Sequence, residues 1–279
     1  MRYRGWLVCV LWAVTGIALA AKPPAAEAEA GIQVEGTIVV GPEGKALEYE
    51  LKGASMLPEA VRRYLDFHIP RWQFEPAEID GKPVALRNRM GIYLVATPHA
   101  DGGMRIVTRS MYFMPTEKDG GYDLSAARMP PPAYPEAARE HGAEATVYLA
   151  LRIGRDGKVV EAIDEQVNLH FLAERDADKW RDIFARSAVR AAQGWRFRPP
   201  TRGPAAALEA WDIRVPVSFT FDDRNRYGRW QAYVPGPRRP VPWLPQAEQD
   251  EALEGLAGGS VHPVGQQGGL KLRTQLQAL

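Results

Sequence analysis

The sequence has one cysteine and almost no net charge, and each lack removes a class of function. Cys9, the single cysteine of the 279 residues, lies in the apolar N-terminal stretch. The chain beyond that stretch therefore has no thiol for a disulfide, a redox centre or a metal site. Lys and Arg number 35 against 34 Asp and Glu, for a net charge of +1. The basic footprint that nucleic-acid binding requires is missing.

Metal-ligand and catalytic motifs are also lacking. No two of the five histidines have the spacing His-x-x-x-His. There is no Gly-x-Ser-x-Gly elbow and no phosphate-binding loop. The acidic clusters at Asp164-Glu165 and at 174–178 are more typical of a solvated surface than of a carboxylate pair or a cation site. The sequence predicts no metal, no cofactor and no enzyme activity; a hydrolytic site assembled in space stays open as an alternative.

Long apolar runs are absent beyond the N-terminus. Arg2 and Arg4 precede the apolar stretch 6–20, which ends in the small-residue motif Ala-Leu-Ala. This is the pattern of a secretory signal, and the stretch is shorter than the roughly 20 residues of a membrane-spanning helix. We expect residues 1–21 to be the signal peptide of an exported, periplasmic protein. An uncleaved anchor in the inner membrane, which would make the protein membrane-bound, is the alternative.

The sequence contains the pattern Trp-x-Phe-x-Pro twice. Residues 195–199 follow a run of helical periodicity over 178–193, and residues 72–76 follow a shorter one. Alternation directs both rings of each pattern to one side of an extended exit from the helix, and the proline prevents further helix. We expect these four rings to be structural core rather than ligand-stacking surfaces: Trp72, Phe74, Trp195 and Phe197.

The elements around the two patterns come in the same order. Two strands are predicted before each pattern and one after it: 34–40, 46–51 and 91–96 around the first, and 146–153, 159–163 and 213–221 around the second. The predicted fold is α+β, with two tandem modules. Each module is a small antiparallel sheet of order β-β-α-β covered by one helix.

These predictions divide the chain into segments. After the signal peptide we expect a leader at 22–31, a degenerate module at 32–115, a linker at 116–128, a second module at 129–223 and a disordered tail at 224–279. In the first module a further strand, 104–114, is expected to pair with 91–96. The tail is rich in proline, glycine and glutamine, a composition that buries too little apolar surface to offset chain entropy. A proline-rich binding motif there is the alternative.

An ordered set of short motifs runs through the second predicted module: Tyr134-Pro135 with Ala138, Asp156-Gly157-Lys158-Val159, Trp195-x-Phe197-x-Pro199 and Val215-Pro216-Val217-x-Phe219. With this set, residues 130–221 resemble the C-terminal domain of the TonB family. Residues 34–96 resemble a degenerate copy, in which Gly36, Gly44, Trp72, Phe74 and Pro76 fit but no Tyr-Pro precedes. Ala145 stands where the family usually has glycine.

The resemblance implies a periplasmic interaction module that grips a short receptor segment by strand addition. The signal pattern, the short leader and the proline-rich stretch after the domain differ from TonB, which has an uncleaved anchor and a long spacer before the domain. We therefore expect a TonB-like protein that holds another envelope protein, such as an outer-membrane receptor. A membrane-anchored TonB-type energy transducer for outer-membrane transport is the alternative. Formation of a homodimer stays open.

Pro216 indicates where a partner would bind. Proline cannot donate to a strand ladder, so the strand 213–221 is predicted to lie at a sheet edge. Such an edge can recruit a peptide strand, although proline on an edge also discourages pairing, and both interpretations stay open. The candidate partner-binding residues are Tyr134, Pro135, Ile213, Val215, Val217 and Phe219.

Cleavage of the signal peptide is directly testable. We expect the mature chain to begin near Ala21, because the small-residue motif ends at Ala20. Intact-mass spectrometry of the protein purified from an envelope fraction measures this. A mass that includes Met1 or the apolar stretch would contradict the signal peptide and favour the anchor.

Overall fold

The computed structural model describes residues 28–79, 82–98, 102–116, 121, 123–170, 176–221, 227–256, 258–264 and 270–274. The predicted signal peptide, 1–21, lies outside these residues. Within them, no helix combines the length and the apolar character that crossing a membrane requires.

The first sheet is built on the long strand β1 (Glu29–Val40). β2 (Ala46–Leu51) pairs with the second half of β1, and β5 (Leu86–Pro98) pairs along most of its length. β6 (Met104–Pro115) pairs with β5, so the predicted pairing of 104–114 with 91–96 is confirmed. The even-numbered apolar residues of β1 face α1 (Glu59–His68), because alternate side chains of a strand point to one side.

The second sheet is built on β8 (Ala145–Gly154). β9 (Val159–Leu169) pairs with one side of β8, and β11 (Ala210–Phe219) pairs with the other. The long helix α3 (Ala177–Gln193) covers the face on which the odd-numbered apolar residues of β8 lie. The two-residue strand β13 (His262–Pro263) pairs with β11 on its outer side.

Shorter elements complete the chain. They are the 3₁₀ turns η1 (Ala54–Met56), η2 (Ile69–Arg71) and η3 (Pro204–Ala207), the hairpin β3 (Ala77–Ile79) and β4 (Lys82–Val84), the paired strands β7 (Ser125–Arg128) and β10 (Arg196–Arg198), the helices α2 (Glu136–Glu140) and α4 (Gln246–Gln249), and β12 (Gln231–Tyr233). The α+β class with antiparallel sheets is confirmed.

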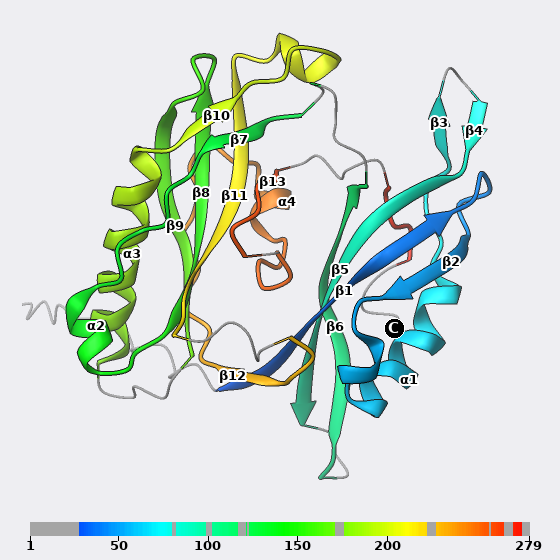
Figure 1. Cartoon of the computed structure of the whole chain (residues 1–279), viewed down its shortest axis with the longest axis horizontal. Helices are drawn as coiled ribbons and strands as arrows, with labels where there is room; N and C mark the ends of the chain where they lie inside the picture. Colours follow the sequence, from blue (N-terminus) through cyan, green and yellow to red (C-terminus); the bar gives the residue numbers. More distant parts are fainter. Residues whose placement is uncertain are drawn as a thin grey trace, which may run out of the picture.

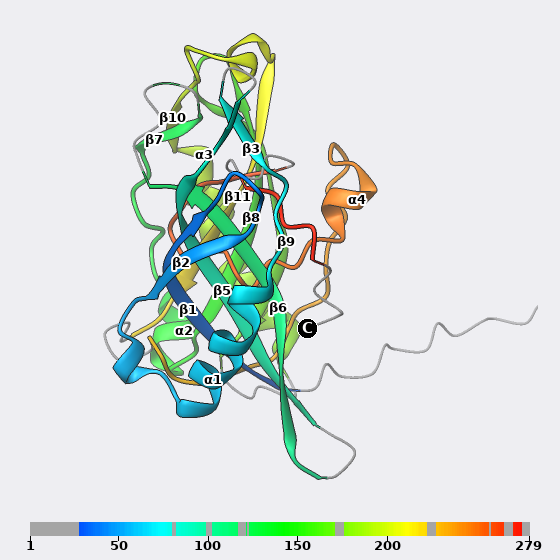
Figure 2. The same cartoon turned by 90° about the vertical axis from the view of Figure 1, so that its right-hand side faces the viewer.

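The two sheets face each other, and the helices α1 and α3 lie on the two outer sides (Figure 1). Of the tail, β13 and α4 lie between the sheets in this view, and β12 lies below them. In the view turned by 90°, α4 stands to one side of the two sheets (Figure 2). A direct contact joins the tail to the second sheet: Gln166 of β9 donates to Glu254 of the tail at 3.2 Å.

The tail differs from its prediction, because its described part is packed rather than disordered. β12 pairs with the start of β1 in the first sheet, while the backbone of Val234 exchanges two hydrogen bonds with Leu169 of β9, at 2.7 and 3.0 Å. Scattered apolar residues are buried: Tyr233, Val241, Leu244, Leu253 and Leu270. The composition argument weighed the proline and glycine content and missed these side chains. Leu270 packs into the core of the first sheet, and Val241 and Leu244 form a small cluster with Ala150.

The four rings of the Trp-x-Phe-x-Pro patterns are all at most 4% exposed. The two tryptophans differ in one respect. Nε1 of Trp195 donates to the C=O of Pro130 at 2.9 Å. Nε1 of Trp72 is buried without a hydrogen-bond partner among the described residues.

Substitution of the two tryptophans tests these environments. Trp195→Ala should destabilise by about 3–5 kcal/mol, the cost of removing a buried aromatic side chain. Trp195→Phe should cost about 0.5–1.5 kcal/mol more than Trp72→Phe, because it alone removes a hydrogen bond, the one to the C=O of Pro130. Urea melts followed by circular dichroism give the free energies of unfolding. Equal losses for the two Phe variants would contradict the assigned bond.

Candidate functional site

The outer side of β11 is the candidate binding edge. Its inner side pairs with β8 at every position from Ala210 to Phe219. On the outer side, the ladder with β13 covers two residues, Ile213 and Arg214. Two further bonds reach the edge: the C=O of Asp212 accepts from the N–H of Val264 at 3.0 Å, and the C=O of Pro216 accepts from the N–H of Gly259 at 2.8 Å.

Pro216 fits this position because of the direction of its backbone. In an antiparallel strand the N–H and C=O of one residue point to the same side. The C=O of Pro216 points outward, so the N–H that proline lacks would also point outward, where the ladder with β8 loses nothing.

The candidate residues on β11 lie away from this edge. Their side chains are buried in the core beneath α3: Ile213, Val215, Val217 and Phe219. Their backbone groups belong to the alternation that faces β8. The outward groups belong instead to the even-numbered residues, of which Asp212 and Pro216 make the two bonds above. The backbone groups that point away from β8 are therefore those of residues one position along from the predicted set. The sequence signal that could have given this register is Pro216 itself, because a proline in a sheet lies where its missing N–H would point away from the paired strand.

Tyr134 and Pro135 lie at the end of β11, in a groove of about 490 Å³ between residues 130–135 and α3. The Tyr134 ring stacks on Phe221 at 4.9 Å and meets Phe219 edge-on at 5.8 Å. Its hydroxyl donates to the C=O of Ala143 at 2.5 Å. Tyr134 thus closes the core of the second sheet, in addition to lining the groove.

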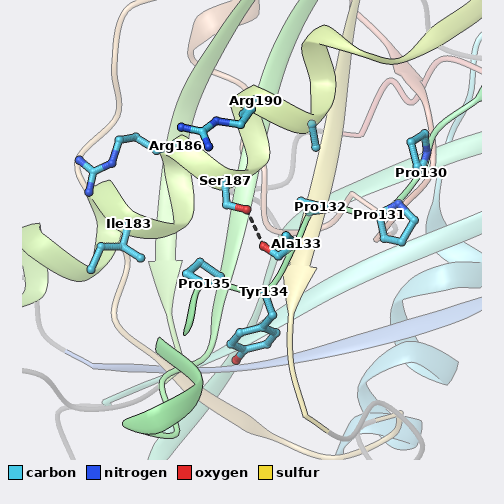
Figure 3. Close-up of a pocket in the computed structure, with 11 residues that line it drawn as sticks. Pro130, Pro131, Pro132, Ala133, Tyr134, Pro135, Ile183, Arg186, Ser187 and Arg190 are labelled. Atoms are coloured by element: carbon cyan, nitrogen blue, oxygen red, sulfur yellow. Dashed lines mark hydrogen bonds between the residues drawn. The ribbon is translucent and has the colours of Figure 1, made fainter. Parts of the chain in front are cut away.

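The α3 side of the groove is basic. Figure 3 shows Arg186 and Arg190 on the helix, with the prolines of 130–132 on the other side of the groove. Both arginines are exposed, and neither has an acidic partner among the described residues. Ser187 between them donates to the C=O of Ala133 at 2.5 Å and ties the proline segment to the helix.

A buried ion cluster lies on the face of β11 that points between the sheets. Arg214 donates to Glu165 of β9 through Nε at 2.8 Å and through Nη2 at 3.1 Å. Nη1 of Arg214 donates to Glu251 at 2.8 Å, and Arg238 also pairs with Glu165. Since Glu251 and Arg238 belong to the tail, this cluster fixes the tail on the second sheet.

The expectation of a solvated surface at Asp164-Glu165 is therefore wrong. Glu165 is 1% exposed, and Asp164 is also buried. Burial raises the pKa of the Asp164 carboxyl, although the Arg239 guanidinium at 3.0 Å opposes this shift. The sequence pattern missed the burial because the arginines that accompany these carboxylates lie about 50 or more residues away in the chain. Among the described residues, no three His, Cys, Asp or Glu side chains gather as metal ligands.

One hundred residues of this chain are 32% identical to protein TonB of Xanthomonas campestris pv. campestris. The same identity and length hold for the protein TonB of strain B100 and for that of strain ATCC 33913. The aligned part is 36% of this chain and 39% of each relative, so the chain spans about two fifths of the length of these relatives. No family model and no solved structure matches the chain. The partial identity to TonB suggests a TonB-like C-terminal domain.

Breaking the buried ion cluster should destabilise the fold. Arg214→Met should cost about 3–5 kcal/mol, because Glu165 stays buried with part of its pairing lost. The double variant Arg214→Met/Glu165→Leu should recover part of this loss, since it removes both charges. Arg155→Met, which removes an exposed pair with Glu209, is the control and should cost less than about 1 kcal/mol. In urea melts, equal losses for Arg214→Met and the control would contradict the buried cluster.

Proposed function

We propose that this protein is a periplasmic, TonB-like binding protein that holds an envelope protein by adding one of its segments as a strand to β11. The observation that carries the proposal is the outer side of β11, where the carbonyls of Asp212 and Pro216 accept bonds from an extended segment and the ladder covers two residues. In strand addition the main-chain bonds supply affinity, and pockets for alternate side chains supply specificity.

The partial identity to TonB supports a role in protein interaction and transport rather than in catalysis. It also supports an envelope location, with an outer-membrane receptor as the class of partner. A second candidate is a TonB-type energy transducer held in the inner membrane by residues 1–21; the same identity favours it. The mass of the mature N-terminus separates the two candidates.

We also propose that the chain carries two related modules. β1 lies between β2 and β5, just as β8 lies between β9 and β11. In each half, a turn glycine accepts a bond from the phenylalanine of the Trp-x-Phe-x-Pro pattern: Phe74 to Gly44 at 2.8 Å, and Phe197 to Gly157 at 2.9 Å.

The two halves differ in the strand that follows the pattern. β6 covers the outer side of β5 along nearly its whole length. The corresponding side of β11 carries the two-residue ladder with β13. The second module is therefore the one whose sheet edge a partner strand could use.

Photo-crosslinking tests the proposed edge. Ser218 is exposed and belongs to the outward set of β11, so p-benzoylphenylalanine in its place should yield an adduct with an envelope protein in cells. The same residue at Arg63, on the exposed side of α1, is the control and should give at least fivefold less adduct. Equal yields at both positions, or no adduct at Ser218, would count against binding at β11.

A further inference from the structure

Residues 258–264 of the tail lie along the outer side of β11; a turn at 258–259 leads into a stretch that contains the short antiparallel strand β13. Gly259 and Val264 donate their N–H groups to Pro216 and Asp212, and the short ladder between these bonds pairs His262 with Arg214. This segment thus occupies the edge at which a partner strand would add.

The alternate side chains of the segment are received on opposite sides. Val261 packs against the core beneath α3. On the other side, the His262 ring meets Tyr112 of β6 edge-on at 5.2 Å, and Val264 packs against the small apolar cluster of Ala150, Val241 and Leu244. Pockets for alternate side chains are what a strand-addition site uses to choose its ligand.

The charged side chains of β11, Asp212 and Arg214, are both paired. Asp212 is held by Arg152 in a bidentate pair at 2.8 and 2.9 Å. Arg214 is neutralised by Glu165 and Glu251. A ligand strand therefore gains nothing from charge, which matches the sequence Gly-Gly-Ser-Val-His-Pro-Val of the segment.

The segment is held less firmly than the strands beneath it. β8 and β11 pair over ten positions, whereas the segment forms a two-residue ladder with one bond on either side. Pro263 has no N–H to donate, and Gly259, at φ +70°, turns the backbone away from an extended course. A longer partner strand would form more bonds along the same edge.

We propose that residues 258–264 are a built-in ligand of β11, which a partner displaces with an uncharged, extended segment carrying a β-branched apolar residue in the place of Val261. This inference rests on the proposed function. A tethered segment has an effective concentration on the order of millimolar. A free peptide at micromolar concentration therefore cannot compete in the native chain, and release of the segment opens the site.

A peptide-binding assay tests the displacement. The variant Gly259→Pro/Val264→Pro removes the two N–H donors that lie on either side of the short ladder with β11. The probe is a fluorescent peptide of residues 258–264 with blocked ends, followed by anisotropy. It should bind the double variant at least tenfold more tightly than it binds the native chain. A probe with Val261→Asp should lose at least tenfold in affinity for the double variant.

Gly102→Pro is the matched control. Gly102 also has a positive φ, of 84°, and a side chain added there would meet nothing within 4 Å. It should bind the probe as weakly as the native chain does. Equal binding to the native chain and to the double variant, or no binding to a double variant that is folded by circular dichroism, would overturn the inference.

Hydrogen exchange of the native chain gives a second readout if the double variant does not fold. The amides of Gly259 and Val264 should be protected, yet exchange at least tenfold faster than those of Val215 and Val217, which face β8. No protection, or equal protection, would overturn the inference. Neither assay needs the envelope partner. If the probe binds while Ser218 gives no adduct even in the released variant, the proposed function fails and the built-in ligand stands.

Discussion

One backbone hydrogen bond, from the N–H of Phe197 to the C=O of Gly157, ties the end of α3 to the turn between β8 and β9. The approach is so close that a Cβ on Gly157 would lie 2.2 Å from the carbonyl oxygen of Phe197, and the φ of +73° also requires glycine. This contact sets where the chain leaves the helix. It therefore sets the position of Trp195 in the core and the start of the path to β11. The register that turns Pro216 outward is that of the pairing between β11 and β8.

The tail is the second determinant of the architecture. The face of the second sheet that α3 does not cover carries Arg214 and Glu165, two charges that are costly to bury. Residues 238–251 of the tail bring Arg238 and Glu251 to this pair and complete it. A buried charge pair is weak evidence for stability in itself, but these ion pairs join the tail to the second sheet. From there the chain continues to the residues that lie along β11.

The spacing of apolar residues predicted the long strands and helices, because the interactions that form these elements are local in sequence. Alternation in β1 and β8, the spacing of apolar residues in α3 and the prolines after each tryptophan all act within a few residues. The end of β9 was missed for the opposite reason. In the sequence, Asp164 and Glu165 look like the end of a strand, because the arginines that pair with them, Arg239 and Arg214, lie much later in the chain. The tail was misjudged in the same way, since β13 is two residues long and exists through its pairing with β11.

From the sequence, the proposed binding edge could be placed on β11, but the residues whose backbone groups point outward could not be identified. Pro216 marked β11, whereas the apolar residues chosen beside it, such as Val215 and Val217, are those that alternation directs into the core. Sequence also gave no sign that the tail occupies the edge. The contact is made by Gly259, by the pair His262–Pro263 and by Val264, which form no periodic pattern.

The segment of β12 and Val234, which pairs with both sheets, has a consequence for the order of folding. Tyr233 lies 204 positions from its partner Glu29 in the first sheet, and Val234 joins β9 of the second. Contacts so distant in sequence form late, because closing a long loop costs entropy before the pairing is gained. During synthesis, which begins at the N-terminus, β1 cannot pair with β12 until more than four fifths of the polypeptide has been made. The first sheet, whose strand β1 is synthesised first, is thus among the last parts of the fold to be completed.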